Sequence, residues 1–349
     1  AGAGQVELPK GHVSFDPEYY KLLAQRMVLE AGVELYTNTV VSACQMADGR
    51  VTHVLIESKD GLQALAAGTV IDATGDGLVC RRAGVPMQVS AGGMQPMSLC
   101  FLLRNVDVTT ALLRDHIHHT GLHGQSKHMG IYHALQRLAE QGKDVPQFGG
   151  PWFNSTMQED LICVNITRAA ANAADRAQLT QAECRMREDA YKLVALLRKL
   201  YPEFAKASIA EIAAQGGVRE TYHIRGLYTL SGADILGGAP CADGVAFCSH
   251  PVDIHSAQDN TQTAQYFDTP CPVPYRVMVA AGFDNLIAAG RCVSCVDEAY
   301  ASMRVQGTCM AIGEAAGVAA AMRRETGCAV TAVNTDALRA RLQKQGAIV

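Results

Sequence analysis

Runs of apolar residues separated by turn-forming residues predict a chain of short strands with a few longer helices. The first helix signal is Asp16-Pro17-Glu18, which combines an N-cap carboxylate with proline at the first helical position. Apolar residues at helical spacing follow until Gly32, which predicts the end of the helix. Strand-like runs come next, at 33–36, 40–46, 51–56 and 65–71. Asp48-Gly49 joins the second and third runs and predicts a hairpin turn.

The middle of the chain combines helix signals with one alternating run. Residues 106–215 are rich in helix signals, and the capping box formed by Thr180 and Glu183 predicts a helix that ends before Pro202. We therefore expect a mostly helical insertion. Beyond it, residues 216–226 alternate apolar and polar positions, which is typical of an antiparallel strand with one wet face.

The most strongly organised stretch runs from Asp284 to Arg323. A short apolar run at 286–289 ends at Gly290, which predicts a buried strand followed by a sharp turn. Small residues dominate 311–322, as in a helix that packs closely against a sheet. A strand that leads into a helix N-terminus is suited to hold a charged, oxygen-rich ligand.

Composition and charge narrow the class of protein. The chain has 349 residues, of which 48% are hydrophobic and 18% are charged, so it is long enough for two domains or for one with an insertion. Its net charge of −4 gives no electrostatic case for binding nucleic acid. Its apolar stretches are far shorter than the roughly 18 residues that a membrane span needs. We therefore expect a globular protein without a membrane span.

Cysteines and histidines are the residues most suited to redox or metal chemistry. The cysteines are mostly scattered singly in apolar runs, which favours reduced thiols in a cytoplasmic protein. One close pair, Cys292 and Cys295, has the spacing of a redox-active dithiol. Histidines gather between His116 and His133, but they form no recognisable metal motif with a carboxylate. We therefore expect solvated histidines and no metal site.

Several segments resemble one family of flavoproteins. They are VIDATGDG at 70–77, QPMSL at 95–99, GVRET at 217–221, PVDIH at 251–255, VPYR at 273–276, NLIAAGRC at 285–292 and QGTCMAIGEAAG at 306–317. In these segments the chain resembles the FAD-dependent oxidoreductase family, a relative of the glutathione reductase and fumarate reductase flavoproteins. The resemblance covers about residues 10–325.

The resemblance implies a mixed α/β fold of the Rossmann-like, FAD/NAD(P)-binding flavoprotein type, incomplete in this chain, with an antiparallel-sheet substrate domain and a helical insertion. It implies a partial FAD-binding domain with a β-meander at 1–98, a substrate or cap domain at 99–275, and a return to the FAD-binding domain at 276–349. The family's Gly-rich βαβ unit, which binds the ADP half of FAD, has no counterpart in this sequence. We therefore expect either a second polypeptide that supplies this unit within a hetero-oligomer, or a chain that has been cut.

The implied cofactor is FAD. The residues expected to bind it are Ala73, Thr74, Gly75, Asp76, Gly290, Arg291, Arg304, Gln306, Gly307 and Thr308. The helix that begins at 306–308 is placed to stabilise negative charge on the flavin N1 and C2 carbonyl. Arg291 stands where glutathione reductase-type chains have aspartate, and its contact with either the ribityl chain or the pyrophosphate stays open.

The implied reaction is hydride transfer between a small polar organic substrate and flavin N5, which also requires a group that takes or gives a proton. We expect His255 to be this general acid or base, with Tyr275 and Arg276 as orienting groups. The fork of an arginine suits a carboxylate on the substrate. The alternative for His255 is a structural histidine beside Asp253.

Two other functions stay open. Cys292-Val-Ser-Cys295 beside a flavin would suit a disulfide oxidoreductase, in which a thiolate of low pKa performs the chemistry. A chain that kept the fold without the flavin would instead serve as a scaffold or regulatory subunit.

Overall fold

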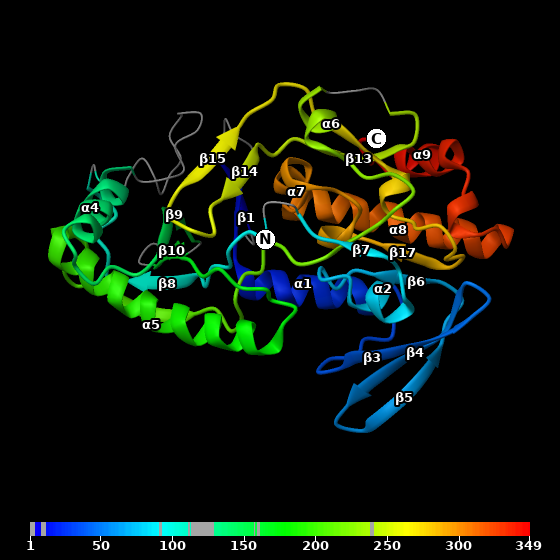
Figure 1. The fold of residues 1–349 in the computed structure, drawn as a ribbon, viewed down its shortest axis with the longest axis horizontal. Coiled ribbons are helices and arrows are strands. Elements are labelled where there is room, and N and C mark those ends of the chain that lie inside the picture. Colours follow the sequence, from blue (N-terminus) through cyan, green and yellow to red (C-terminus); the bar gives the residue numbers. More distant parts are fainter. Residues whose placement is uncertain are drawn as a thin grey trace. The chain divides into compact units, whose positions relative to one another are not determined.

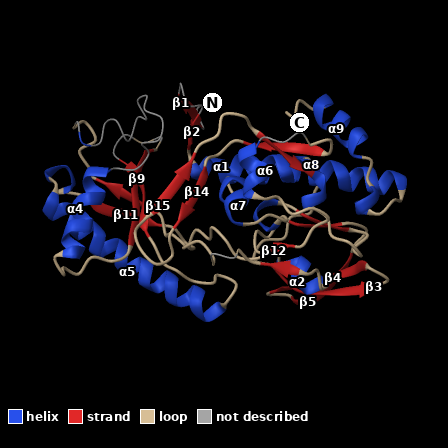
Figure 2. Cartoon of the chain, turned by 45° about the horizontal axis from the view of Figure 1, so that its top comes forward, coloured by secondary structure: helices blue, strands red, loops and turns tan. Residues whose placement is uncertain are grey.

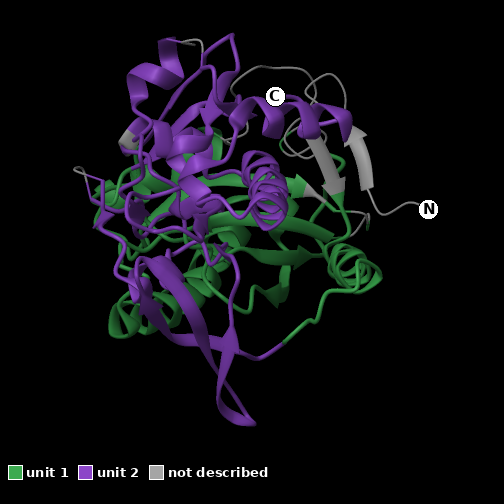
Figure 3. Ribbon diagram, turned by 90° about the vertical axis from the view of Figure 1, so that its right-hand side faces the viewer, with its two compact units in different colours: residues 1–36, 96–218, 256–261 green, residues 37–95, 219–255, 262–349 purple. Residues whose placement is uncertain are grey.

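The computed structural model describes residues 4–7, 12–90, 93–110, 112, 129–156, 158, 161–237 and 241–349. The chain forms two compact units, each built from three separate segments (Figure 3). Unit 1 comprises 1–36, 96–218 and 256–261, and unit 2 comprises 37–95, 219–255 and 262–349. The division expected from the sequence has other bounds, with an FAD-binding domain at 1–98 and 276–349 on either side of a substrate or cap domain at 99–275. Both mix helices with strands, which confirms the expected mixed α/β class (Figure 2).

Unit 1 is built around a four-stranded antiparallel sheet in the order β11–β8–β10–β9, of which Figure 1 labels β8, β9 and β10. Its strands are β1 (Gly4–Glu7), β2 (His12–Phe15), β8 (Phe101–Arg104), β9 (Phe148–Ser155), β10 (Leu161–Thr167) and β11 (Ser208–Ile212). Its helices are α1 (Pro17–Glu30), α4 (Met129–Glu140), α5 (Arg176–Leu200) and the 3-10 helix η1 (Pro202–Phe204). Phe101 and Val164 lie opposite each other in the register and share a core with Leu193 and Leu197 of α5.

Unit 2 contains a three-stranded meander, β3–β4–β5, and four two-stranded pairings: β17–β6, β12–β7, β13–β16 and β14–β15. The first group of strands is β3 (Val40–Ala47), β4 (Arg50–Ser58), β5 (Gly61–Ala66), β6 (Val70–Asp72) and β7 (Met87–Gln88). The second group is β12 (His223–Ile224), β13 (Gly244–Cys248), β14 (Val252–His255), β15 (Gln262–Gln265), β16 (Cys271–Pro274) and β17 (Leu286–Ala288).

The helices of unit 2 are α2 (Leu78–Ala83), α6 (Gly232–Gly237), α7 (Asp297–Met303), α8 (Gln306–Thr326) and α9 (Thr335–Lys344), with 3-10 turns η2 (Tyr275–Val277), η3 (Gly290–Cys292) and η4 (Val330–Ala332). The small side chains of Ala315, Ala316 and Ala319 are fully buried on α8, which contacts β13. Small residues let the helix backbone approach the strand closely, as the sequence predicts.

Local signals located several elements correctly. The Asp16 side chain accepts hydrogen bonds from the amides of Glu18 and Tyr19, and α1 ends before Gly32, whose φ is +72°. The hairpin between β3 and β4 turns at Asp48 and Gly49 with φ of +47° and +73°, the left-handed conformation that this type of turn requires.

Other predictions were wrong or only partly correct. Residues 33–36 form no strand, the run at 65–71 divides between β5 and β6, and only His223–Ile224 of 216–226 pairs as a strand, with β7. The segment expected to be mostly helical contains α4 and α5 but also strands β9, β10 and β11. The strands β9, β10 and β11 form because they pair with each other or with β8 in one sheet, whereas residues 33–36 have no strand partner among the described residues.

The helix α5 begins earlier than its apparent capping box. Its N-cap is Asp175, whose carboxylate accepts from the amide of Gln178 at 2.9 Å. Thr180 lies inside the helix and donates to the carbonyl of Arg176, while Glu183 accepts from the amide of Gly216 at 2.7 Å. The glutamate therefore ties a distant loop to the helix instead of closing a cap.

No helix among the described residues is long and apolar enough to cross a membrane.

The position of this N-cap can be tested by substitution. Asp175→Ala should lower the free energy of unfolding by about 1 kcal/mol, because an amide at the helix start loses its acceptor. Thr180→Ala is the matched control, since it removes a hydroxyl bonded within the same helix, and it should change stability much less. Urea unfolding followed by circular dichroism measures both variants. A larger loss for Thr180→Ala would contradict this helix boundary.

Candidate functional site

The candidate site begins where two parallel strands end. In unit 2, β6 and β17 pair in parallel, with Asp72 opposite Ala288, and the amide of Ala289 donates to the carbonyl of Asp72 at 2.9 Å. The turns that follow the two strands, 73–77 and 289–291, therefore leave the same edge. In open α/β sheets, ligands bind at this carboxyl edge.

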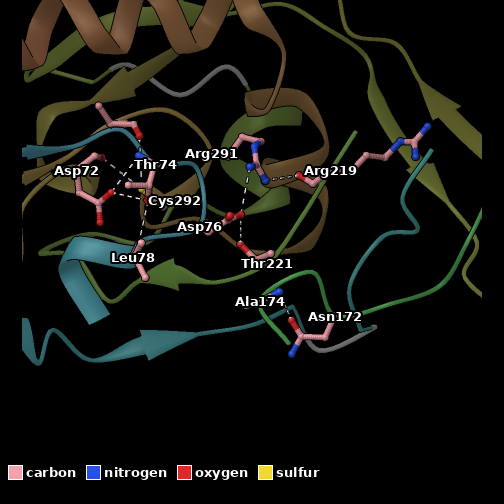
Figure 4. A network of polar contacts seen from close by, with 11 residues as sticks. Asp72, Thr74, Asp76, Leu78, Asn172, Ala174, Arg219, Thr221, Arg291 and Cys292 are labelled. Atoms are coloured by element: carbon pink, nitrogen blue, oxygen red, sulfur yellow. Dashed lines mark hydrogen bonds and ion pairs between the residues drawn. The ribbon is translucent and has the colours of Figure 1, made fainter. Parts of the chain in front are cut away.

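The first turn is fixed by a buried carboxylate. Asp72 accepts hydrogen bonds from the amide and hydroxyl of Thr74 and from the amide of Cys80, at 2.7–3.0 Å (Figure 4). The hydroxyl of Thr74 also accepts from the amide of Leu78 at the start of α2. Gly75 follows with φ of +78°. These bonds hold the expected cofactor-binding turn in one conformation before any ligand binds.

Arg291 lies over this turn. Its guanidinium contacts the carboxylate of Asp76 at 3.2 Å and donates to the carbonyl of Arg219, and Asp76 also accepts from the hydroxyl of Thr221 at 2.9 Å (Figure 4). A Cβ added at Gly75 would clash with the Arg291 guanidinium. Glycine at this position therefore allows the arginine and the turn to approach each other closely.

A second cluster surrounds His255. The ring nitrogen Nε2 lies 2.9 Å from the Asp253 carboxylate, which also forms an ion pair with Arg304 at 3.0 Å and accepts from Gln262. Burial raises the pKa of Asp253, but the hydrogen bond from His255 and the nearby positive charges outweigh it, so that the pKa lies below its ordinary value. Asp253 is thus ionised at neutral pH.

A third cluster links the other two. Glu220, which is 2% exposed, accepts from the hydroxyl of Ser90 and from the amide of Gln95, and lies 3.4 Å from Nε2 of His223. The side chain of Gln95 accepts from the amide of His255 at 3.2 Å. The neighbours of Glu220 in the chain, Arg219 and Thr221, make the contacts to Arg291 and Asp76 described above.

The sequence analysis did not assign a role to this third cluster. The sequence did contain a signal for these residues, because Gln95 and Glu220 both lie in segments that resemble the flavoprotein family. Gln95 and Glu220 lie more than a hundred positions apart in the chain, so nothing in the local sequence pattern pairs them.

The helix α8 begins at Gln306, two positions after Arg304. Gln306 and Gly307 are exposed, Thr308 is buried, and no side chain caps the first amides. Unpaired amides at the start of a long helix attract negative charge.

These residues fit the polar, negatively charged groups of FAD. A Cβ at Gly290 or Gly307 would meet no atom within 4 Å, so both backbones face open space. Arg304 Nε is buried without a hydrogen-bond partner among the described residues. The open glycines, the uncapped α8 amides and this unsatisfied donor all suit an oxygen-rich anionic ligand.

The other two expected catalytic residues are engaged elsewhere in unit 2. The hydroxyl of Tyr275 donates to the carbonyl of Val330 at 2.9 Å within the core, and burial raises its pKa above the ordinary value. Arg276 makes two hydrogen bonds to the carboxylate of Asp243, at 2.9 and 3.1 Å. None of these contacts involves His255.

The thiols of Cys292 and Cys295 contact different groups in the structure. Both thiols are free and buried, but Cys292 donates to the carbonyls of Asp72 and Ala289, whereas Cys295 contacts Nδ1 of His223 at 3.7 Å. Burial raises the pKa of Cys292 to about 12. A high thiol pKa opposes the reactive thiolate that a disulfide oxidoreductase needs.

No metal site was found in the part of the chain that the structure describes, where no group of three histidine, cysteine or acidic side chains could hold an ion. The histidines from His116 to His128 lie outside the described residues, and His133 lies on α4.

Comparison with known proteins identifies a family. The family described as FAD dependent oxidoreductase matches residues 2–342. No curated protein sequence matches the chain.

Three solved structures illustrate the similar folds. The flavin-dependent brominase Bmp2 is 12% identical, with a TM-score of 0.45, and the match covers 95% of this chain and 61% of that one. A geranylgeranyl bacteriochlorophyll reductase-like protein from Thermoplasma acidophilum is 12% identical, with a TM-score of 0.42 and coverage of 94% and 58%. The flavin-dependent halogenase CmlS is 14% identical, with a TM-score of 0.45 and coverage of 95% and 44%. The chain thus spans less than two thirds of each structure.

The contact between Gly75 and Arg291 yields a first test of the site. Gly75→Ala should weaken FAD binding about tenfold or more, because the new methyl group displaces Arg291. A tenfold loss of affinity corresponds to about 1.4 kcal/mol of binding free energy. Gly61→Ala is the control: its φ is +94°, but no neighbour lies near its Cβ. Titration of the protein with FAD, followed by flavin fluorescence, compares the two. Unchanged affinity in Gly75→Ala would show that this contact does not shape the site.

The buried pair of His223 and Glu220 yields a pH test. Burial alone would lower the pKa of His223, but its contacts with Cys295 and Glu220 raise it to about 10. Because the pKa is higher in the folded than in the unfolded state, protonated His223 stabilises the fold fully below about pH 6.5. This contribution is lost as the pH rises toward 10.

His223→Gln should therefore flatten the dependence of the unfolding free energy on pH between about 6.5 and 10. His133→Gln, which changes an exposed residue of α4, should keep the wild-type profile. Denaturant titrations at a series of pH values measure both variants. A wild-type slope in His223→Gln would mean that His223 does not titrate as a buried cation.

Proposed function

The chain belongs to the family of FAD-dependent oxidoreductases, and from this premise we propose that unit 2 holds the isoalloxazine end of FAD beside His255. The proposed reaction moves a hydride between a small polar organic substrate and flavin N5. The proposal rests mainly on one observation, the sharing of the Asp253 carboxylate between His255 and Arg304.

This shared carboxylate connects the candidate base to the candidate cofactor site. Arg304 lies two positions before Gln306, the first residue of α8, and its ion pair with Asp253 joins β14 to that helix start. His255 is therefore anchored close to the uncapped amides that suit a negatively charged cofactor.

The proposed role of His255 is to take or give the proton that accompanies hydride transfer. Flavin, when bound, supplies the two-electron acceptor. The ionised Asp253 accepts a hydrogen bond from Nε2–H, which leaves Nδ1 as the basic ring nitrogen and holds the ring in one orientation. A carboxylate in this position also stabilises the imidazolium that forms when His255 takes a proton.

The proposed substrate is small and polar, and it carries a carboxylate. Recognition of that carboxylate was predicted for Arg276, but Nε and Nη2 of Arg276 already donate to the carboxylate of Asp243. In the proposal this role passes to Arg291, which lies in the cofactor turn and contacts the Asp76 carboxylate through Nη2.

We also propose that a partner polypeptide supplies the ADP-binding unit. Support comes from β6, which pairs with β17 in a two-stranded parallel sheet and exposes 37% of Ile71. Parallel strands are normally covered on both faces, so an apolar side chain exposed on β6 suggests a missing cover.

Substitution of His255 tests the proposed reaction. In FAD-loaded protein without oxygen, His255→Ala should retain flavin but slow its bleaching by a panel of small carboxylated compounds about 100-fold or more. His255→Gln keeps a hydrogen-bond donor for Asp253, so slow bleaching in this variant as well is not explained by loss of that bond. His250→Ala is the matched control, because this neighbouring imidazole contacts the carbonyl of Pro251.

Two results would count against the proposal in different ways. Bleaching of His255→Ala at the wild-type rate would remove His255 from the reaction while leaving the cofactor site intact. A purified wild-type protein that binds no FAD, alone or with a partner, would instead favour the scaffold function.

A further inference from the structure

Two cysteines to which the proposed function gives no role lie directly opposite each other on two strands. Cys248 is the last residue of β13 and Cys271 is the first residue of β16, and the antiparallel register places them opposite each other. Both are buried, with 1% and 2% of their surface exposed, and belong to the core of unit 2. Both thiols are free in the structure.

This position satisfies the geometric requirement for a disulfide. Opposed residues of an antiparallel pair have Cα atoms about 4.5–5.5 Å apart and side chains on the same face. Disulfides span Cα distances of about 4.4–6.8 Å. A bond between these two sulfurs therefore requires adjustment of side chains rather than a new backbone conformation.

We propose that Cys248 and Cys271 are a site of oxidative modification, at which hydrogen peroxide forms a disulfide that joins β13 to β16. The Cys248 thiolate attacks one peroxide oxygen; the O–O bond breaks, an S–O bond forms, and hydroxide leaves. Cys271 then attacks the sulfur of the resulting sulfenic acid, its proton passing to the departing oxygen. Overall, two thiols lose two electrons and peroxide becomes two waters.

The surroundings of the two thiols assign their roles. The neighbouring Cys271 and Ser302 side chains lower the pKa of Cys248 despite its burial. The contact with Cys248 raises the pKa of Cys271, which also donates to the carbonyl of Asp234 at 3.4 Å. The more acidic thiol is the better attacking group at neutral pH.

A cavity lies beside this end of the two strands. Its volume is about 630 Å³, and its lining includes Ser249, which follows Cys248, and Pro270, which precedes Cys271. Phe247 and Ser249 line the cavity, so alternation places Cys248 on the opposite face of β13. The cavity therefore lies on the other face of the strand, and peroxide reaches the two buried sulfurs when the strand ends open locally.

Peptide mapping tests this inference on the folded full chain. The protein is treated with hydrogen peroxide or kept reduced, then alkylated in denaturant and digested without reductant. The expected product is a cross-linked peptide containing Cys248 and Cys271, with an unfolding midpoint raised by roughly 3–6 °C. Cys100 and Cys163, which interact without being register partners, serve as the internal control pair.

Single substitutions separate the two roles. In Cys271→Ser, peroxide should leave Cys248 as a sulfenic acid that dimedone traps, whereas in Cys248→Ser dimedone should not label Cys271. Full alkylation of both cysteines in peroxide-treated wild-type protein that is still folded would overturn the proposal. Cross-linking of Cys100 to Cys163 at the same rate would also overturn it, because the register would then give no selectivity.

Discussion

The candidate site depends on the burial of one carboxylate, that of Glu220. A buried carboxylate is costly unless donors surround it, and here Ser90, the amide of Gln95 and His223 supply them. These donors come from separate segments of unit 2, so satisfying the charge holds the segments together. The side chain of Gln95 then reaches the amide of His255. The site is thus assembled around a residue to which we assign no direct role in the reaction.

Two kinds of constraint therefore shape unit 2. Asp72 acts locally: its bonds to Thr74 and Cys80 fix a turn within a few residues of itself. Glu220 and Asp253 act over long range, since each carboxylate joins segments that are distant in the chain. Removing a local constraint would disturb one turn, whereas removing a long-range one would separate the candidate base from the cofactor edge.

This distinction explains what the sequence could predict. The strand β17, the Asp48–Gly49 hairpin and the helix α8 follow from neighbouring residues, and the structure confirms them. The partner of Tyr275 is the carbonyl of Val330, and that of Arg276 is Asp243, far before it in the chain. No periodicity encodes such contacts. The same limit affects the cysteines: spacing drew attention to Cys292 and Cys295, but strand register determines that Cys248 faces Cys271.

The balance of charge in unit 2 indicates how the site can attract an anionic cofactor. Arg291 is paired with Asp76, Arg304 with Asp253, and His223 with Glu220, so these three cations are already neutralised by neighbouring carboxylates. Attraction must then come from groups without a carboxylate partner, and the first amides of α8, which no side chain caps, have that property. Backbone dipoles are fixed in place and need no rearrangement when a ligand arrives. Paired arginines would instead position the ligand through directed hydrogen bonds, with the helix start supplying the net positive potential.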